Sequence, residues 1–317
     1  MIFFLSVLVG LFCSVVAPPT SKAEVTPQST GIVHTADTDL SYEQFGHDAG
    51  KTPAIIVNGG PGFSHTYMYL TDVFTKKFSQ NRSVIFYDQR GIGKSKLLRA
   101  SAPEGLEAQV ADLEALRVRL GYNRIDLIGH SWGGLLSMAY AAAYPQRIQH
   151  LVLIDSAGPN WYKSRYLFEE VFPDQLANED EIAKGNDAAA KSSGELLRRF
   201  LARDFYSQER FQELIGKLSS EELAKVNNQN IDDAVQDALK NRDLTDDLKR
   251  FTFPTLVMWG RYDINSAVVT GWKISQAVPG AKIVIYEKTR HFPFYEEESS
   301  FLHDLNQFLS DTSGSTH

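Results

Sequence analysis

A serine in a glycine-rich turn is the residue best placed to do chemistry. It lies in Gly129-His130-Ser131-Trp132-Gly133-Gly134, after the apolar run 125–128 and before an apolar helical pattern that begins at residue 135. The spacing G-x-S-x-G between a strand and a helix is typical of a nucleophile elbow, a sharp turn in which only glycine neighbours avoid a collision. The hydroxyl would lie at the head of a helix, where backbone N–H groups favour developing negative charge. Ser131 is therefore the predicted nucleophile.

A serine hydroxyl needs a base, and the base needs an acid to orient it. Of the eight histidines, His291 follows the strand-like run 282–286 and lies in a loop, from which it could reach in from the end of a sheet. His130 is expected to point away from the serine, and the remaining histidines to be structural or solvated. His291 is therefore the predicted base.

Two aspartates compete for the role of the acid. Asp263 follows the strand-like run 255–259 through a short loop, which would place its carboxylate at the same end of the sheet as His291. Asp155 ends the run 151–154 and could reach the same edge. Asp263 is preferred because Asp155 opens a segment that reads as an exit from the sheet, but both remain candidates.

The oxyanion formed by acyl attack needs two preorganised N–H donors. The N–H of Trp132, the residue after the nucleophile, is one candidate. The second is expected from the loop Asn58-Gly59-Gly60-Pro61-Gly62, where glycines let the backbone approach a substrate, and Gly60 is the nominated donor.

These residues all follow short β-branched runs that alternate with amphipathic ones, a pattern typical of an α/β protein with a mostly parallel sheet. The expected strands are 54–57, 83–87, 125–128, 150–154, 255–259 and 282–286. Apolar residues at helical spacing predict a helix over 107–120, ended by Gly121. Residues 31–46 are typical of an N-terminal hairpin.

The strand-like runs stop between about residues 158 and 250, where polar residues and helically spaced leucines dominate. This stretch is expected to be a helical cap inserted between two parts of one core, 24–157 and 251–310. Residues 311–317 are expected to form a flexible tail.

The N-terminal segment differs from the rest because residues 2–17 are almost wholly apolar. Residues 1–23 resemble a signal peptide, which predicts a secreted or periplasmic enzyme without stable membrane association. An uncleaved membrane anchor is the alternative, although this run of 16 residues falls short of the roughly 20 that a spanning helix needs. Cleavage would remove Cys13, the sole cysteine.

Composition excludes several classes of function. The formal net charge is -7 and no basic stripe could follow phosphates, so nucleic acid is not an expected partner. The histidines are too scattered for a zinc site, and the incomplete match at Gly93-Lys94-Ser95 excludes a phosphate-binding P-loop. A small-molecule or short-peptide substrate is expected instead.

Five motifs in order resemble the proline iminopeptidase branch of the α/β-hydrolase superfamily. They are Asn58 to Gly62, Tyr87 to Ser95, Gly129 to Gly134, Gly260 to Asp263 and Arg290 to Phe294. The resemblance implies the α/β-hydrolase fold, with helices flanking the sheet and a helical cap that shapes the substrate site. It also implies Ser131 as nucleophile, His291 as base, Asp263 as orienter, Gly60 and Trp132 as oxyanion donors, and no cofactor or metal.

The chain departs from the family pattern at two places. Asn58 stands where the family loop usually begins with histidine, which alters a loop-bracing hydrogen bond. No cap motif matches the glutamates with which these aminopeptidases hold the substrate amine. Glu169 and Glu170, beside aromatic residues, are candidates on chemistry alone, and a solvated helix face explains them equally well.

Three functions therefore remain open. The favoured one is an exported serine hydrolase that releases N-terminal residues, proline above all, from short peptides through an acyl-enzyme intermediate. The alternative is a carboxylic ester hydrolase on the same scaffold. The third, a catalytically silent binding protein, is disfavoured because all three triad residues are present.

Overall fold

The computed structural model describes residues 26–163, 170–174, 177, 198, 201–216 and 229–310. The predicted signal peptide, the predicted tail, Glu169 and much of the predicted cap lie outside these residues. Within them, no helix is long and apolar enough to cross a membrane.

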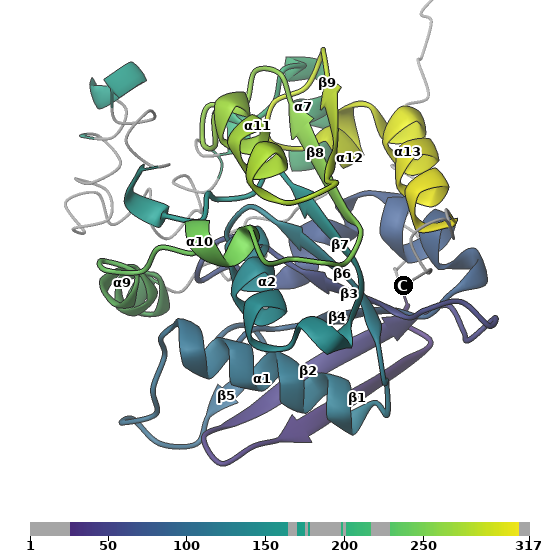
Figure 1. Ribbon diagram of the computed structural model, residues 1–317, viewed down its shortest axis with the longest axis vertical. Coiled ribbons are helices and arrows are strands. Elements are labelled where there is room, and N and C mark those ends of the chain that lie inside the picture. Colours follow the sequence, from purple (N-terminus) through teal and green to yellow (C-terminus); the bar gives the residue numbers. More distant parts are fainter. Residues whose placement is uncertain are drawn as a thin grey trace, which may run out of the picture.

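A nine-stranded sheet forms the centre of the molecule (Figure 1). Its strand order is β1-β2-β4-β3-β6-β7-β8-β9, with β5 paired to β2 outside this path. The first hairpin and its contact with β4 are antiparallel, whereas β4, β3, β6, β7, β8 and β9 run parallel to one another. The strands are β1 (Ser29–His34), β2 (Thr38–Phe45), β3 (Ala54–Val57), β4 (Val84–Tyr87), β5 (Lys96–Leu97), β6 (Ile125–His130), β7 (Ile148–Ile154), β8 (Thr255–Gly260) and β9 (Lys282–Tyr286).

The central strands are buried on both faces, which explains why their sequences are apolar without interruption. Alternate residues of one strand enter different cores: Ile55 and Val57 belong to one cluster, and Ile56 belongs to the other. The first cluster includes residues of α1, α2 and α11, and the second includes residues of η2, η3 and α13. The sheet therefore separates two hydrophobic cores.

Helices cover both faces, and Figure 1 shows α1 and α2 together on one side, with α13 in yellow away from them. The helices are α1 (Leu106–Arg119), α2 (Trp132–Ala143), α7 (Gln208–Ile215), α9 (Gln229–Ala238), α10 (Thr245–Leu248), α11 (Val268–Ala277), α12 (Pro293–Glu296) and α13 (Glu298–Ser310). Short 3₁₀ and π turns are η1 (His65–Leu70), η2 (Val73–Lys77), η3 (Phe78–Asn81) and η4 (Pro145–Arg147).

The sequence predicts these elements closely. Each of the six expected strands is present, the N-terminal hairpin is β1 and β2, and α1 ends before Gly121, whose φ of 75° is the left-handed conformation that stops a helix. The two-residue strand β5 and the turns η1 to η3 were not expected, because such short elements leave no periodic signal.

The segment between β7 and β8 contains α7, α9 and α10. These helices occupy described parts of the stretch predicted to be a cap. Leu244 N–H donates to the Pro159 carbonyl at 2.9 Å, so the two ends of this stretch lie side by side. The cap boundaries themselves stay a prediction.

Candidate active site

The backbone at Ser131 has the strained geometry that the sequence predicts. Ser131, between β6 and α2, has φ 57° and ψ -125°. A Cβ on Gly129 would lie 2.4 Å from the Gly133 carbonyl oxygen, and one on Gly133 would lie 2.1 Å from the Val57 carbonyl oxygen. The turn therefore requires glycine at both positions, because backbone atoms fill the space of any side chain.

His291 and Asp263 form a buried pair. Nδ1 of His291 lies 2.8 Å from Oδ2 of Asp263, and because an ionised carboxylate only accepts, this nitrogen carries the proton. Burial by itself would lower the pKa of His291, but the charge and hydrogen bond of Asp263 outweigh it, so the pKa is raised. Nε2 is thereby left as the nitrogen that can accept a proton.

Asp155, the alternative acid, lies in the same cluster. One carboxyl oxygen of Asp155, one of Asp263 and one ring nitrogen of His291 all lie within 4.8 Å of one another. Oδ1 of Asp155 accepts the N–H of Gly260 at 2.8 Å. Asp263 makes the direct hydrogen bond with His291, and Asp155 lies beside this pair. This is also a donor set that could surround a cation, but the hydrogen bond between His291 and Asp263 already uses two of its atoms.

The loop after β3 packs directly against the serine. A Cβ on Gly59 would lie 2.8 Å from Cβ of Ser131 and 3.3 Å from its Oγ. Asn58 braces this loop by donating from Nδ2 to the carbonyls of Phe63 at 2.7 Å and Gly59 at 2.9 Å. Within the described residues, the N–H groups of Gly60 and Trp132 make no hydrogen bond, so both nominated donors remain available.

Tyr67 and His130 connect the glycine loop to the histidine loop, a role the sequence did not reveal. Nε2 of His130 lies 2.8 Å from the His291 carbonyl and must donate, so its Nδ1 accepts the hydroxyl of Tyr67 at 2.7 Å. That hydroxyl in turn accepts the N–H of Gly59 at 2.6 Å. Burial lowers the pKa of His130 well below its usual range, which keeps this tautomer neutral.

A buried ionic cluster lies around His65, at the start of η1. Nδ1 of His65 lies 2.7 Å from Oδ1 of Asp88, and its Nε2 lies 3.8 Å from Oε2 of Glu43. Burial alone would lower the pKa of His65, but these two carboxylates raise it to about 9. The adjacent His65 in turn lowers the pKa of Glu43 to about 2. The charged cluster fixes η1 to β2 and to the loop after β4.

Asp204 is the second group that sequence analysis missed. It lies in the segment before α7, it is fully buried, and neither carboxyl oxygen accepts a hydrogen bond in the described part of the chain. Burial raises the pKa of Asp204 to about 7, although the positive charge of a protonated His291 opposes this shift. The sequence carries no signal for it, because its burial depends on the contact between the segment 201–207 and the His291 loop.

That contact is held by three hydrogen bonds, each of which uses at least one backbone group. The N–H of His291 donates to the carbonyl of Asp204 at 3.0 Å, and the N–H of Ser207 donates to Oε1 of Glu296 at 2.8 Å. Arg290 donates from Nη1 to the Arg203 carbonyl at 2.5 Å. Asp204 is thus fixed beside the predicted base.

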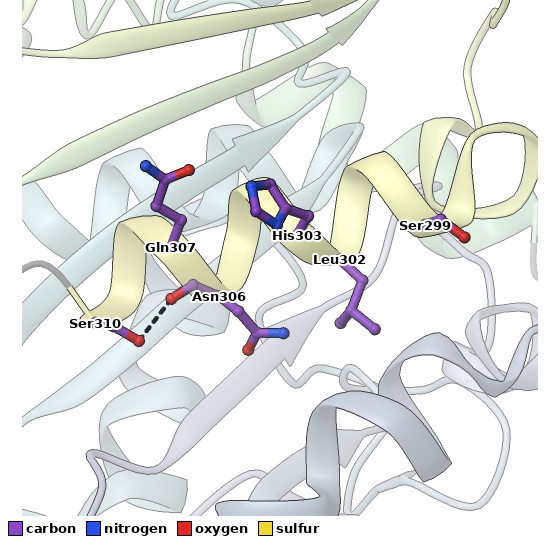
Figure 2. Close-up of a pocket in the computed structure, with 6 residues that line it drawn as sticks. All are labelled: Ser299, Leu302, His303, Asn306, Gln307 and Ser310. Carbon is purple, nitrogen blue, oxygen red and sulfur yellow. Dashed lines mark hydrogen bonds between the residues drawn. The ribbon is translucent and has the colours of Figure 1, made fainter.

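Of the two remaining candidates, the structure describes only Glu170. Glu170 is exposed, and Glu169 lies outside the described residues. A shallow hollow elsewhere is formed by one helix, α13 (Figure 2). Its lining residues share no member with the site described above and are Ser299, Leu302, His303, Asn306, Gln307 and Ser310.

The family follows from comparison with known proteins. A model of the alpha/beta hydrolase fold family matches residues 52–298. The chain therefore belongs to the alpha/beta hydrolase family and is an enzyme, a hydrolase of the serine type.

Individual relatives show which members of this family the chain resembles. The chain is 26% identical over 289 residues to a proline iminopeptidase of Heyndrickxia coagulans, which covers 88% of this chain and 98% of that one. It is 29% identical over 287 residues to a proline iminopeptidase of Saccharolobus solfataricus, covering 86% and 89%. A solved structure of an alpha/beta fold family hydrolase from Bacillus anthracis matches with a TM-score of 0.71 at 22% identity. The match covers 90% of this chain and 99% of that chain, and it shows a shared fold. The chain is thus similar to the proline iminopeptidases, as the five motifs indicate.

Proposed function

We propose that this protein is an exported aminopeptidase that releases N-terminal proline from short peptides or prolyl amides. Ser131, His291 and Asp263 form the triad. The observation that carries the substrate class is Asp204, which is fully buried beside His291 and whose carboxyl oxygens accept no hydrogen bond within the described residues. Nε of Arg203 lies 3.9 Å from Oδ1 of Asp204, beyond hydrogen-bond distance. A buried carboxylate is costly unless a cation pairs with it, and the ammonium of a peptide N-terminus is such a cation.

In the proposed reaction, Oγ of Ser131 attacks the carbonyl of the N-terminal residue while Nε2 of His291 takes its proton. Asp263 stabilises the resulting imidazolium, and the N–H groups of Gly60 and Trp132 hold the oxyanion. His291 then returns the proton to the leaving amine, which departs and leaves a prolyl ester on Ser131. Water, deprotonated by His291, hydrolyses this ester and releases proline.

The substrate ammonium would pair with Asp204 throughout this reaction. Binding the cation favours the ionised carboxylate and so lowers the pKa of Asp204 from about 7. The Asp204 carboxylate would then gain a charge-assisted hydrogen bond, which its oxygens lack within the described residues. A substrate without a free amine gains nothing from this contact, which is the basis of the proposed selectivity.

The test compares three substrates with the full chain: a prolyl arylamide, its N-acetylated form and a short-chain aryl ester. We expect turnover of the free-amine amide and none of the acetylated amide. Asp204→Asn should lower kcat/KM on the prolyl arylamide by about 10- to 100-fold, from the loss of a charged hydrogen bond. Glu170→Gln, which alters an exposed carboxylate, is the matched comparison for the cap candidates of the sequence.

Two outcomes would overturn the proposal. Hydrolysis of the ester alone would make this an ester hydrolase, and equal rates on the free and acetylated amides would remove any role for an amine-binding carboxylate.

Export belongs to the same proposal and is supported by the apolar segment 2–17. N-terminal sequencing of the protein recovered from the expressing cells should give a chain that starts at Glu24. Recovery of intact Met1 in the membrane fraction would favour the uncleaved anchor instead.

A further inference from the structure

The cluster around His291 contains one more carboxyl than a triad needs. Asp155, Asp263 and His291 are all buried, and their nearest donor atoms lie within 4.8 Å of one another. Asp155 follows β7, whereas Asp263 follows β8, so neighbouring parallel strands deliver the two carboxyls to one point.

Each of two buried carboxyls at this distance disfavours the ionisation of the other, because burial removes the bulk solvent that would screen their repulsion. Asp263 has the better support for a negative charge. Its Oδ1 accepts the N–H groups of Asn265 and Ser266 at 2.9 and 3.2 Å, and its Oδ2 faces His291. Asp155 accepts one N–H, that of Gly260, and no donor group of the described residues reaches its Oδ2. The proton therefore belongs on Asp155.

The backbone of Asp155 gives an independent indication. Among the described residues, Ser131 and Asp155 are the two non-glycine residues with positive φ, at 57° and 40°. Strained backbone of this kind persists where the surrounding structure enforces it, and it concentrates at functional sites. The conformation aims the Asp155 side chain at Asp263 and not at solvent, since the residue is fully buried.

We propose that Asp155 is a neutral carboxyl that donates its proton to Asp263, and that it is a reserve acid able to orient His291 when Asp263 is removed. This inference rests on the proposed triad. Asp155 does not touch the reacting atoms and acts through Asp263 or His291, so it is a positioning residue.

The charges around the cluster agree with this assignment. Burial and the neighbouring Asp263 raise the pKa of Asp155 well above its usual range, and the carboxylate of Glu296 on α12 adds to the effect. Burial, Asp263 and Glu296 each disfavour a second anion at Asp155.

The kinetic test compares Asp263→Ala with the double variant Asp155→Asn/Asp263→Ala, which differ only in the side chain at position 155. In Asp263→Ala, ionised Asp155 should hold Nδ1 of His291, so kcat should fall by no more than about 100-fold. In the double variant no carboxylate remains beside His291, and kcat should fall by about 10⁴-fold, the effect of losing the acid of a triad. Equal kcat values in the two variants would overturn the reserve role.

A second measurement tests the proton without using activity. The infrared difference spectrum of wild type minus Asp155→Asn, taken at about pH 8, should contain the C=O band of a protonated carboxyl. A carboxylate band in its place would overturn the neutral assignment, even if the Asp263 variants fail to fold. Failure of the proposed function is distinguishable, because the band does not depend on which substrate is cleaved.

Discussion

At the residue scale, the geometry of the site depends on side chains that backbone hydrogen bonds hold in place. The N–H of Ser131 donates to the Ile154 carbonyl at 3.0 Å, so the elbow is tied to the end of β7. The N–H of Asp155 donates to the Met258 carbonyl at 3.0 Å, which connects the residue that follows β7 to β8. Neighbouring strand ends therefore fix Ser131, the predicted nucleophile, and the two carboxyls relative to one another.

Removal of the Ser131 hydroxyl tests the predicted nucleophile. Ser131→Ala should lower kcat by at least about 10³-fold, because no other group can form the acyl enzyme. The urea midpoint of unfolding should change little, since an alanine keeps the Cβ and the tight turn. Steady-state kinetics on the prolyl arylamide check the first expectation, and a fluorophosphonate that labels wild type alone checks the position. Activity close to wild type would exclude Ser131 as nucleophile.

The raised pKa of Asp204 can be tested through the pH dependence of the free energy of unfolding. Its pKa of about 7 lies above the value of 3.8 for an unperturbed aspartate, so between about pH 4 and 7 the folded chain holds a proton that the unfolded chain has lost. Stability from this group is therefore lost as pH rises through that window. Asp204→Asn should remove this loss, which amounts to on the order of 4 kcal/mol at most.

Denaturant unfolding of wild type and Asp204→Asn at about pH 4.5 and 8 measures this difference. The variant should gain stability relative to wild type at the higher pH. A constant difference between the two proteins at both values of pH would show that Asp204 does not titrate in this window.

At the element scale, the loop after β3 and the loop after β9 form one unit through Tyr67 and His130. The glycine loop is bonded to the Tyr67 hydroxyl, which donates to His130, and His130 donates to the His291 carbonyl. These loops follow strands that β6, β7 and β8 separate, so this connection crosses the carboxyl edge of the sheet. A displacement of either loop therefore changes the distance between the predicted oxyanion donors and the predicted base.

Tyr67→Phe should disrupt this connection. It leaves Gly59 N–H and His130 Nδ1 without their partner, at a cost of about 1–3 kcal/mol in the free energy of unfolding. We expect kcat to fall and KM to change little, because the connection positions the catalytic groups and does not contact the substrate amine. Tyr144→Phe is the control, since no hydrogen bond described for the structure uses the Tyr144 hydroxyl. Equal effects of the two substitutions on kcat would contradict this role.

At the scale of the whole molecule, one buried histidine links three segments and should influence the pH dependence of unfolding. The folded-state pKa of His65, about 9, exceeds its ordinary value of 6.5. The stabilisation of the folded state by protonated His65 is therefore complete below pH 6.5 and is lost as pH rises through about 9.

His65→Gln should flatten this dependence. Between about pH 6 and 9.5, wild type should lose on the order of 3 kcal/mol more than the variant. Urea unfolding at both values of pH measures the two losses, and groups shared by both proteins cancel in the comparison. Parallel losses would show that His65 is not protonated in the folded state.

Much of the fold is predictable from local sequence. The parallel strands are short apolar runs because both their faces are buried, and such runs are visible without any tertiary information. The strands β3, β4, β6, β7, β8 and β9 were expected near their observed positions for this reason. The strand β5 depends on pairing with β2 and has no pattern of its own.

Sequence also determined the glycine turn at Ser131 and the pairing of His291 with an aspartate, because the turn is local and the order of the motifs is covalent. The tertiary structure alone decided that Asp263 contacts His291 while Asp155 lies beside both. It also buried Asp204 against the histidine loop and left Glu170 exposed, which the cap sequence does not indicate. The physical reason is that the burial of a carboxyl and its lack of hydrogen bonds depend on the residues around it, and segments far apart in the chain supply those residues.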